Sequence, residues 1–135
     1  MQIQPYLFFD GSCEQALAFY ATAVGAKVEM LMRYKESPEP PAPGCAPPDG
    51  EKVMYVAFRV GDSVVMASDA PPGQHKGFHG FSLSLSVKTP EEARQRFDAL
   101  AQGGHVFMPL DKTFFSPAFG MLTDRFGVQW MVLTQ

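Results

Sequence analysis

Hydrophobic and polar residues alternate along several short stretches of the chain, and this pattern predicts β-strands. The clearest case is Phe81–Val87 (FSLSLSV), where serines and apolar residues strictly alternate. Side chains alternate between the two faces of a strand, so this strand has one polar and one apolar face. The predicted strands are Ile3–Phe9, Lys27–Lys35, Val53–Val60, Ser63–Ser68, Phe81–Val87, His105–Met108 and the two arms of a hairpin within Phe119–Leu133.

Two other stretches carry apolar residues at helical spacing. Ser12 and Gln15 have the spacing of a capping box, which predicts the start of the first helix. Leu17, Tyr20 and Val24 then recur at i, i+3 and i+7 and form its apolar face. The first helix therefore follows the first strand directly.

The second helix follows the alternating strand in the same way. Thr89 and Glu92 have capping-box spacing, and Pro90 occupies the first helical position, where its missing N–H is tolerated. Its apolar face consists of Ala93, Phe97 and Leu100.

The order of elements is β-α-β-β-β, and it occurs twice. We interpret residues 1–69 as the first βαβββ module, 70–77 as a linker and 78–135 as the second module, within one structural domain of the α+β class. Each half alone would leave one face of its sheet exposed, so the halves are expected to pair, within one chain or between chains. The alternative is a ferredoxin-like α+β domain with additional strands.

The closing hairpin and a proline-rich stretch are the two remaining features. Asp124 and Gly127 stand at the first and last positions of a predicted type I turn. The arm Val128–Leu133 is apolar enough for a central strand. Glu36–Gly50 contains six prolines and is predicted to be irregular; we expect this loop to act as a lid over the bound ligand.

Composition excludes some classes of function. The 135 residues are 46% hydrophobic and 19% charged, with a formal net charge of −3 and no basic run, which argues against a nucleic-acid partner. Apolar runs are too short for a membrane span or a signal peptide. Cys13 and Cys45 form no disulfide framework, and a cytoplasmic location is expected.

Two motifs resemble a known superfamily. Pro5–Ala26 (PYLFFDGSCEQALAFYATAVGA) is similar to the start of vicinal-oxygen-chelate proteins, the glyoxalase/bleomycin-resistance/dioxygenase superfamily. Phe119–Val132 (FGMLTDRFGVQWMV) resembles its PhnB-like branch, whose members often carry a demethylubiquinone methyltransferase label. The resemblance implies two βαβββ modules in a curved eight-stranded sheet around a cleft, and commonly a homodimer. The sequence lacks the Gly-rich signature of a nucleotide cofactor, so methyl transfer is not expected.

The resemblance also implies where metal ligands would stand. In metal-dependent relatives these are His or Glu on the first strand of each module and on the last strand, and the matching positions here are Pro5, Ser82 and Met131. None of these suits a hard divalent cation, so we expect no catalytic metal and no cofactor. A metal-dependent enzyme would need other ligands, and His75, His79 and Asp69 are the alternatives, although Asp69 is expected to be solvated at the cleft rim.

Strand alternation selects the side chains that would line the cleft, while Trp130 is expected to pack behind it. The expected ligand-binding residues are Tyr55, Arg59, Ser82, Ser84, Phe115, Gln129 and Met131. Alternative interpretations remain open: the serines face water on a one-sided sheet, Arg59 is an ordinary surface residue, and Phe115 belongs to the core. Cys13 lies on the first turn of a helix, where the dipole favours a thiolate, but it has no histidine beside it in sequence and is interpreted as ordinary.

Three functions fit these observations. The first is a PhnB-like protein that binds a small, partly apolar molecule in its cleft, without proven catalysis. The second is a metal-dependent lyase, isomerase or dioxygenase of the glyoxalase type, and the third is a protein that sequesters a drug or antibiotic. A cleft of apolar walls with a few polar groups is typical of small-molecule sites, which favours the first.

Overall fold

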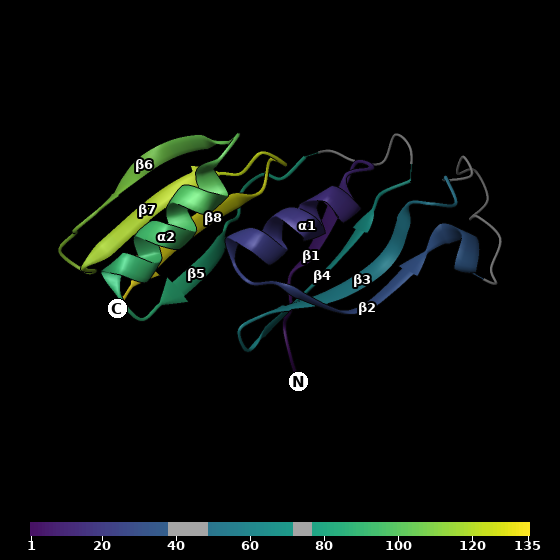
Figure 1. The fold of residues 1–135 in the computed structure, drawn as a ribbon, viewed down its shortest axis with the longest axis horizontal. Helices are drawn as coiled ribbons and strands as arrows, with labels where there is room; N and C mark the ends of the chain where they lie inside the picture. Colours follow the sequence, from purple (N-terminus) through teal and green to yellow (C-terminus); the bar gives the residue numbers. More distant parts are fainter. Residues whose placement is uncertain (38–48, 72–76) are drawn as a thin grey trace. The chain divides into compact units, whose positions relative to one another are not determined.

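The computed structural model describes residues 1–37, 49–71 and 77–135 (Figure 1). These residues form two compact units, Met1–Gly77 and Phe78–Gln135, and each unit is described by itself. Residues 38–48 of the predicted lid Glu36–Gly50, Cys45 among them, lie outside the described residues, and so does His75.

Among its described residues, the first unit contains one α-helix, a short 3₁₀ helix and a four-stranded sheet (Figure 1). Its strand order is β1-β4-β3-β2, in which β1 runs parallel to β4 and the other neighbours are antiparallel. The elements are β1 (Tyr6–Phe9), α1 (Cys13–Ala23), β2 (Lys27–Arg33), a short 3₁₀ helix (Tyr34–Glu36), β3 (Val53–Val60) and β4 (Ser63–Asp69).

The second unit repeats this arrangement. Its strand order is β5-β8-β7-β6, with β5 parallel to β8. The elements are β5 (Leu83–Val87), α2 (Pro90–Ala101), β6 (His105–Asp111), β7 (Ala118–Thr123) and β8 (Gln129–Thr134). The predicted βαβββ repeat and the α+β class are confirmed, and β8 is a central strand, as predicted from its apolar sequence.

In the first unit, α1 packs on one face of the sheet. The ring of Tyr20 stacks on that of Phe58 with centroids 6.1 Å apart, so Phe58 faces the helix. Leu17, Tyr20 and Val24, the predicted apolar face of α1, are all buried. Since side chains alternate along β3, its neighbours Ala57 and Arg59 point to the opposite face.

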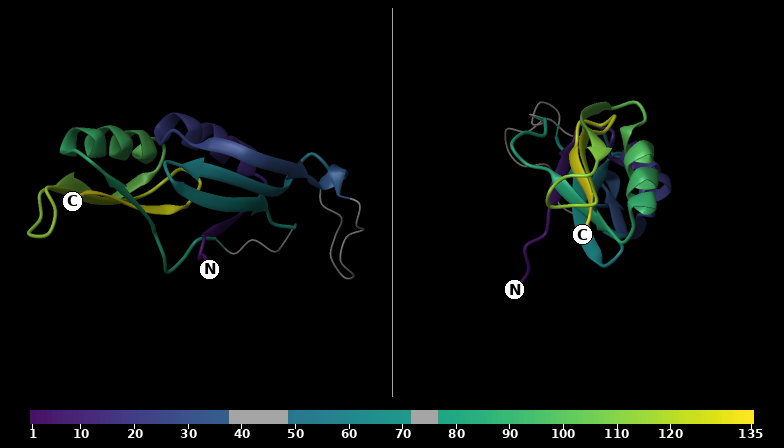
Figure 2. Two further views of the ribbon diagram at one scale, coloured as in Figure 1. Left: turned by 90° about the horizontal axis from the view of Figure 1, so that it is seen from below. Right: turned by 90° about the vertical axis from the view of Figure 1, so that its left-hand side faces the viewer.

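In the second unit, α2 covers one face of the sheet, as both views in Figure 2 show. A Cβ placed on Gly120 would lie 2.6 Å from Cε2 of Phe97, so the absence of a side chain on β7 lets the helix approach closely. Gly120 is paired with Val132, and Leu122 with Trp130. Trp130 is buried on the helix side of the sheet, as predicted.

Several predicted strand limits need correction. β1 begins at Tyr6 rather than Ile3, β2 ends at Arg33, and β5 begins at Leu83. β6 continues through Pro109 to Asp111, three residues beyond the predicted end. Because β6 is an edge strand with register shifts, a proline without an N–H is tolerated there.

The two helix starts differ from each other. Thr89 accepts a hydrogen bond from the N–H of Glu92 at 3.1 Å, so the predicted cap of α2 is present. The predicted capping box of Ser12 is wrong, because the Ser12 side chain makes no capping hydrogen bond. Instead, Oδ1 of Asp69, at the end of β4, accepts a hydrogen bond from the Cys13 N–H at 2.9 Å.

Candidate functional site

The face of the first sheet opposite α1 carries aromatic and methionine side chains. The register aligns Tyr6 with Met66, Met66 with Ala57, and Ala57 with Met30, so one row crosses all four strands. Two residues further along these strands, Phe8 is paired with Ser68 and Tyr55 with Met32, and all four side chains lie on the same face. No helix of this unit covers that face in the part of the chain that the structure describes, and we call it the first open face.

Two predicted site residues lie on the first open face. The Tyr55 ring is 6.4 Å from that of Tyr6, which is itself 4.9 Å from Phe8. Arg59 has Nε 3.4 Å from the Glu29 carboxylate and Nη1 3.3 Å from the carbonyl oxygen of Asp62. The guanidinium of Arg59 therefore already has an anionic neighbour before any ligand binds.

The second sheet has an equivalent row on the face opposite α2, which we call the second open face. Here the register aligns Ser84 with Met131, Met131 with Met121, and Met121 with Met108. The next row pairs Ser86 with Leu133 and Leu133 with Phe119. Cross-strand neighbours lie about 5 Å apart, so the side chains of each row form a continuous surface.

The remaining predicted site residues belong to the second unit. Ser84, Gln129 and Met131 are on strands of the second open face, and Ser82 precedes β5. Phe115 lies in the loop between β6 and β7 and is 56% exposed. Its ring centroid is 5.0 Å from that of Phe119, so Phe115 packs against a residue of this face.

Methionines are concentrated on the two open faces, and the sequence analysis missed this. The chain has eight, all among the described residues; beyond Met1, six of the remaining seven lie on open faces, and Met54 has no cross-strand partner because it lies at a register shift in β3. Alternation along single strands does not reveal this pattern, because register shifts change the facing between Val28 and Met30 and between Val106 and Met108. Its recognition requires the register that aligns separate strands. The six methionines are Met30, Met32, Met66, Met108, Met121 and Met131.

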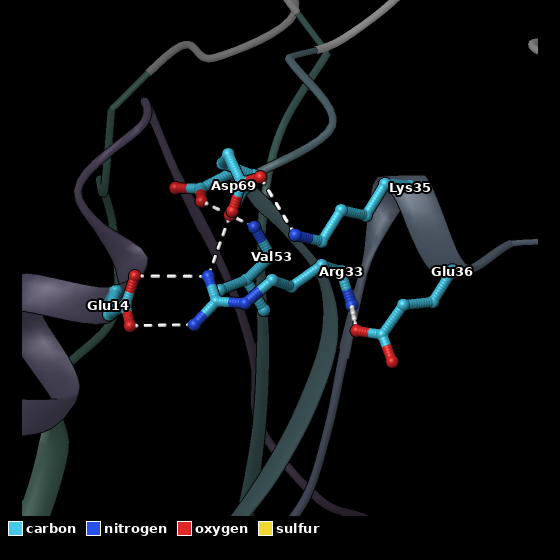
Figure 3. Close-up of polar contacts among 7 residues, drawn as sticks. Glu14, Arg33, Lys35, Glu36, Val53 and Asp69 are labelled. Atoms are coloured by element: carbon cyan, nitrogen blue, oxygen red, sulfur yellow. Dashed lines mark hydrogen bonds and ion pairs between the residues drawn. The ribbon is translucent and has the colours of Figure 1, made fainter.

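A cluster of charged side chains lies at one end of the first unit (Figure 3). The Arg33 guanidinium donates two hydrogen bonds to Glu14, at 2.8 and 3.1 Å, and a third to the carbonyl oxygen of Glu51 at 2.7 Å. The bidentate hydrogen bond from Arg33 holds the pKa of the Glu14 carboxyl below its ordinary value. These contacts join the first turn of α1 to the ends of β2 and β3, which is a structural role.

Asp69 belongs to the same end of the unit but is buried. It is only 2% exposed, so the expectation of a solvated rim carboxylate is wrong. Its two carboxylate oxygens accept hydrogen bonds from the backbone N–H groups of Cys13 and Val53, both at 2.9 Å. The Tyr34 hydroxyl donates to the backbone carbonyl of Asp69 at 2.7 Å. Asp69 thereby joins α1, β3 and β4.

Cys13 lies beside Asp69 and has no reactive environment. Burial raises the pKa of the Cys13 thiol to about 12, and the negative charges of Asp69 and Glu14 act in the same direction. These effects exceed the helix dipole, which alone would favour the thiolate. The interpretation of Cys13 as an ordinary buried thiol agrees with this environment.

Within residues 1–37, 49–71 and 77–135, no group of three or more His, Cys, Asp or Glu side chains is placed to hold a metal ion. His79 and His105 are both exposed, and His105 packs edge-on against Phe107 with centroids 4.9 Å apart. The expected absence of a catalytic metal stays a prediction. No helix within the same residues is long and apolar enough to cross a membrane.

Known proteins resemble the chain along its full length. The sequence model of the family described as 3-demethylubiquinone-9 3-methyltransferase matches residues 1–133. Protein YjdN of Escherichia coli (strain K12) is 35% identical over 140 residues, which cover 98% of this chain and 94% of YjdN.

Solved structures agree with this relationship. Protein PA1353 from Pseudomonas aeruginosa is 42% identical, with a TM-score of 0.88 over 100% of this chain and 98% of that one. A putative 3-demethylubiquinone-9 3-methyltransferase, PhnB protein, from Bacillus cereus is 28% identical, with a TM-score of 0.84 over 100% of both chains.

The fold extends to more distant proteins. A glyoxylase/bleomycin resistance protein/dioxygenase domain from Frankia sp. EAN1pec has a TM-score of 0.67 over 99% of this chain and 90% of that one, at 13% identity. At that identity the likeness concerns the fold alone. By its sequence, the chain belongs to the family described as 3-demethylubiquinone-9 3-methyltransferase, and its fold is that of the glyoxalase/bleomycin resistance protein/dioxygenase domain.

Proposed function

We propose that this protein binds a small, partly apolar molecule on the open faces of its two sheets. The observation that carries the proposal is the placement of six of the seven methionines after Met1 on those faces. Methionine is unbranched and polarizable, so a surface rich in methionine adapts its shape to different apolar partners. A sheet face that contacts only water would gain no stability from such apolar side chains.

Polar groups on the same faces would orient the bound molecule. The first open face has the hydroxyl of Tyr55, and the second has the hydroxyl of Ser84 and the amide of Gln129. A few polar groups among apolar walls are typical of small-molecule sites, where the apolar part supplies affinity and the polar part supplies specificity.

The family description names methyl transfer, but the residues give that activity no support. The chain has no strand followed by a Gly-rich loop and a helix, the arrangement that binds the phosphates of a nucleotide cofactor. A metal-dependent reaction of the glyoxalase type would need ligands that Pro5, Ser82 and Met131 do not provide. Binding without a resident cofactor is therefore the function that we propose.

A ligand-observed NMR screen of neutral fragments, recorded by saturation transfer, tests the proposal. The informative variants are Met66→Lys and Met131→Lys, which place a charge on the first and second open faces. Ala18→Lys is the matched control, because Ala18 is exposed on α1. We expect fragments that bind the wild-type protein and Ala18→Lys to bind at least one of the two methionine variants much more weakly, since an ammonium group keeps water on the apolar surface. Fragments that bind all four proteins equally would contradict the proposal.

A further inference from the structure

We propose that the second open face selects a planar aromatic molecule that carries an uncharged hydrogen-bonding group. This inference rests on the proposed function and specifies the chemical class of the ligand. Three features of the face lead to it: a row of thioethers, a braced aromatic side chain and a line of serine hydroxyls.

The thioethers of Met108, Met121 and Met131 form the centre of the face. They are cross-strand neighbours on β6, β7 and β8, so their side chains lie about 5 Å from one another at the base. Thioether sulfur makes favourable contacts with aromatic rings, which add to the general gain of apolar burial. Three thioethers in one row therefore offer contacts to more than one ring of a bound molecule.

Phe115 packs against Phe119, which lies two residues from Met121 on β7, and is held in place. Its ring packs edge-on against Phe119 at 5.0 Å and 74°, and against Phe114 at 5.1 Å and 85°. Aromatic pairs in such geometry are favourable beyond the area they bury, and a bound ring could extend the same edge-to-face series. Phe115 remains 56% exposed, so part of its surface is available for contact.

The loop that carries Phe115 is braced by Ser116, which is buried. The Ser116 N–H donates to Oγ1 of Thr113 at 3.1 Å, and the Thr113 N–H donates to the carbonyl oxygen of Ser116 at 2.9 Å. The Ser116 hydroxyl contacts the carbonyl oxygens of Ala118 and Thr134, the last at the end of β8. Because the loop is ordered before binding, less conformational entropy is lost when a ligand contacts Phe115.

The serine hydroxyls and the absence of charge in the central row indicate that the polar group of the ligand is uncharged. Ser84 is paired with Met131 and Ser86 with Leu133, so two exposed hydroxyls flank the apolar rows along β5. A serine hydroxyl both donates and accepts hydrogen bonds, which suits a phenol, a ring carbonyl or a ring nitrogen. The row from Ser84 to Met108 is uncharged, so a charged ligand group would be desolvated there without compensation.

The test compares 2-naphthol with decahydro-2-naphthol, its saturated counterpart, by isothermal titration calorimetry. Both carry one hydroxyl on a fused bicyclic frame, but only the first is planar and aromatic. We expect 2-naphthol to bind about two- to tenfold more tightly, which corresponds to the range measured for favourable aromatic contacts. Equal affinity, tighter binding of the saturated compound, or no binding of 2-naphthol at millimolar concentration would overturn the inference.

Variants separate the inference from the proposed function. Phe115→Leu should remove most of the preference for 2-naphthol, whereas Phe81→Leu, at an exposed position whose ring contacts Phe78, should keep it. Ser84→Ala should weaken 2-naphthol binding about two- to tenfold through the lost hydrogen bond. If both compounds bind equally and Met131→Lys abolishes both, the proposed function stands and the aromatic preference falls. Dimerisation that buries this face would appear as weaker binding at higher protein concentration and would also overturn the inference.

Discussion

The buried carboxylate of Asp124 accepts a hydrogen bond from the indole Nε1–H of Trp130 at 2.9 Å. The other carboxylate oxygen of Asp124 accepts hydrogen bonds from the backbone N–H groups of Phe126 and Val128, at 2.8 and 3.0 Å. Trp130 therefore connects the turn between β7 and β8 to the apolar layer under α2. The predicted turn is present, with the N–H of Gly127 donating to the carbonyl oxygen of Asp124 at 3.0 Å.

Replacement of Trp130 should test this connection. Trp130→Ala leaves a cavity under α2 and should destabilise the protein by about 3–5 kcal/mol, a large share of the total for a small domain. Trp130→Phe keeps most of the packing but loses the hydrogen bond to Asp124, and should cost about 1–3 kcal/mol. Met131→Leu, on the open face, should change stability by less than about 1.5 kcal/mol. Urea denaturation followed by circular dichroism measures all three, and a fully stable Trp130→Ala would mean that the facing of β8 is reversed.

Asp69 should be more important for stability than Ser12, although Ser12 precedes the helix. Asp69→Ala leaves the buried N–H groups of Cys13 and Val53 without their partner, so we expect a loss of at least about 2 kcal/mol in the free energy of unfolding. Ser12→Ala should change it by less than about 0.5 kcal/mol. Both values come from the same urea titration, and comparable losses for the two variants would contradict the assignment of Asp69 as the cap of α1.

These two caps indicate how far a sequence alone predicts this structure. The cap of α2 was predictable because Thr89 and Glu92 are three residues apart. The cap of α1 comes from Asp69, which is 56 residues from Cys13 in the sequence, so no local pattern contains it. Arg59 is similar, because its anionic neighbour Glu29 stands on another strand, thirty residues away.

The candidate site shows the same division between local and long-range information. Alternation along each strand was sufficient to place Ser84 and Met131 on the face away from the helix. The methionine row could not be derived in that way, because the alignment of Met121 with Met108 depends on a register shift in β6. Such register shifts depend on the packing of the whole sheet, so the sequence of a single strand does not predict them.

The Cys13 thiol should remain protonated in the folded protein. Its folded pKa is about 12, above the ordinary value of 9.0, so the folded state favours the neutral thiol. The contribution to stability is complete below about pH 9 and is lost as the pH rises from about 9 toward 12, because only the unfolded thiol ionises in that window. A Cys45→Ser variant isolates Cys13, and its reaction with a disulfide reagent at pH 8 should be negligible until urea unfolds the protein. Rapid reaction of the native protein would contradict this.

A homodimer is expected at micromolar concentration. Each four-stranded sheet has two edge strands, β1 and β2 in the first and β5 and β6 in the second, whose outer edges have no strand partner among the described residues and therefore favour association. β6 adds the exposed apolar side chains of Val106 and Phe107. Light scattering coupled to size-exclusion chromatography measures the mass directly. A mass near 14.8 kDa across the micromolar range would exclude the dimer.

The measurement that tests the central claim most directly is a ¹³C spectrum of methionine methyl groups, recorded while the protein is titrated with the fragment that binds it most tightly. Single Met→Leu variants assign the signals, and Met1 is an internal control because it precedes β1 and belongs to neither sheet. We predict that methyl signals from the set Met30, Met32, Met66, Met108, Met121 and Met131 shift with the binding curve while the Met1 signal stays in place. A titration that shifts Met1 as much as any of these, or that saturates without moving any open-face methyl, would contradict ligand binding on the open faces.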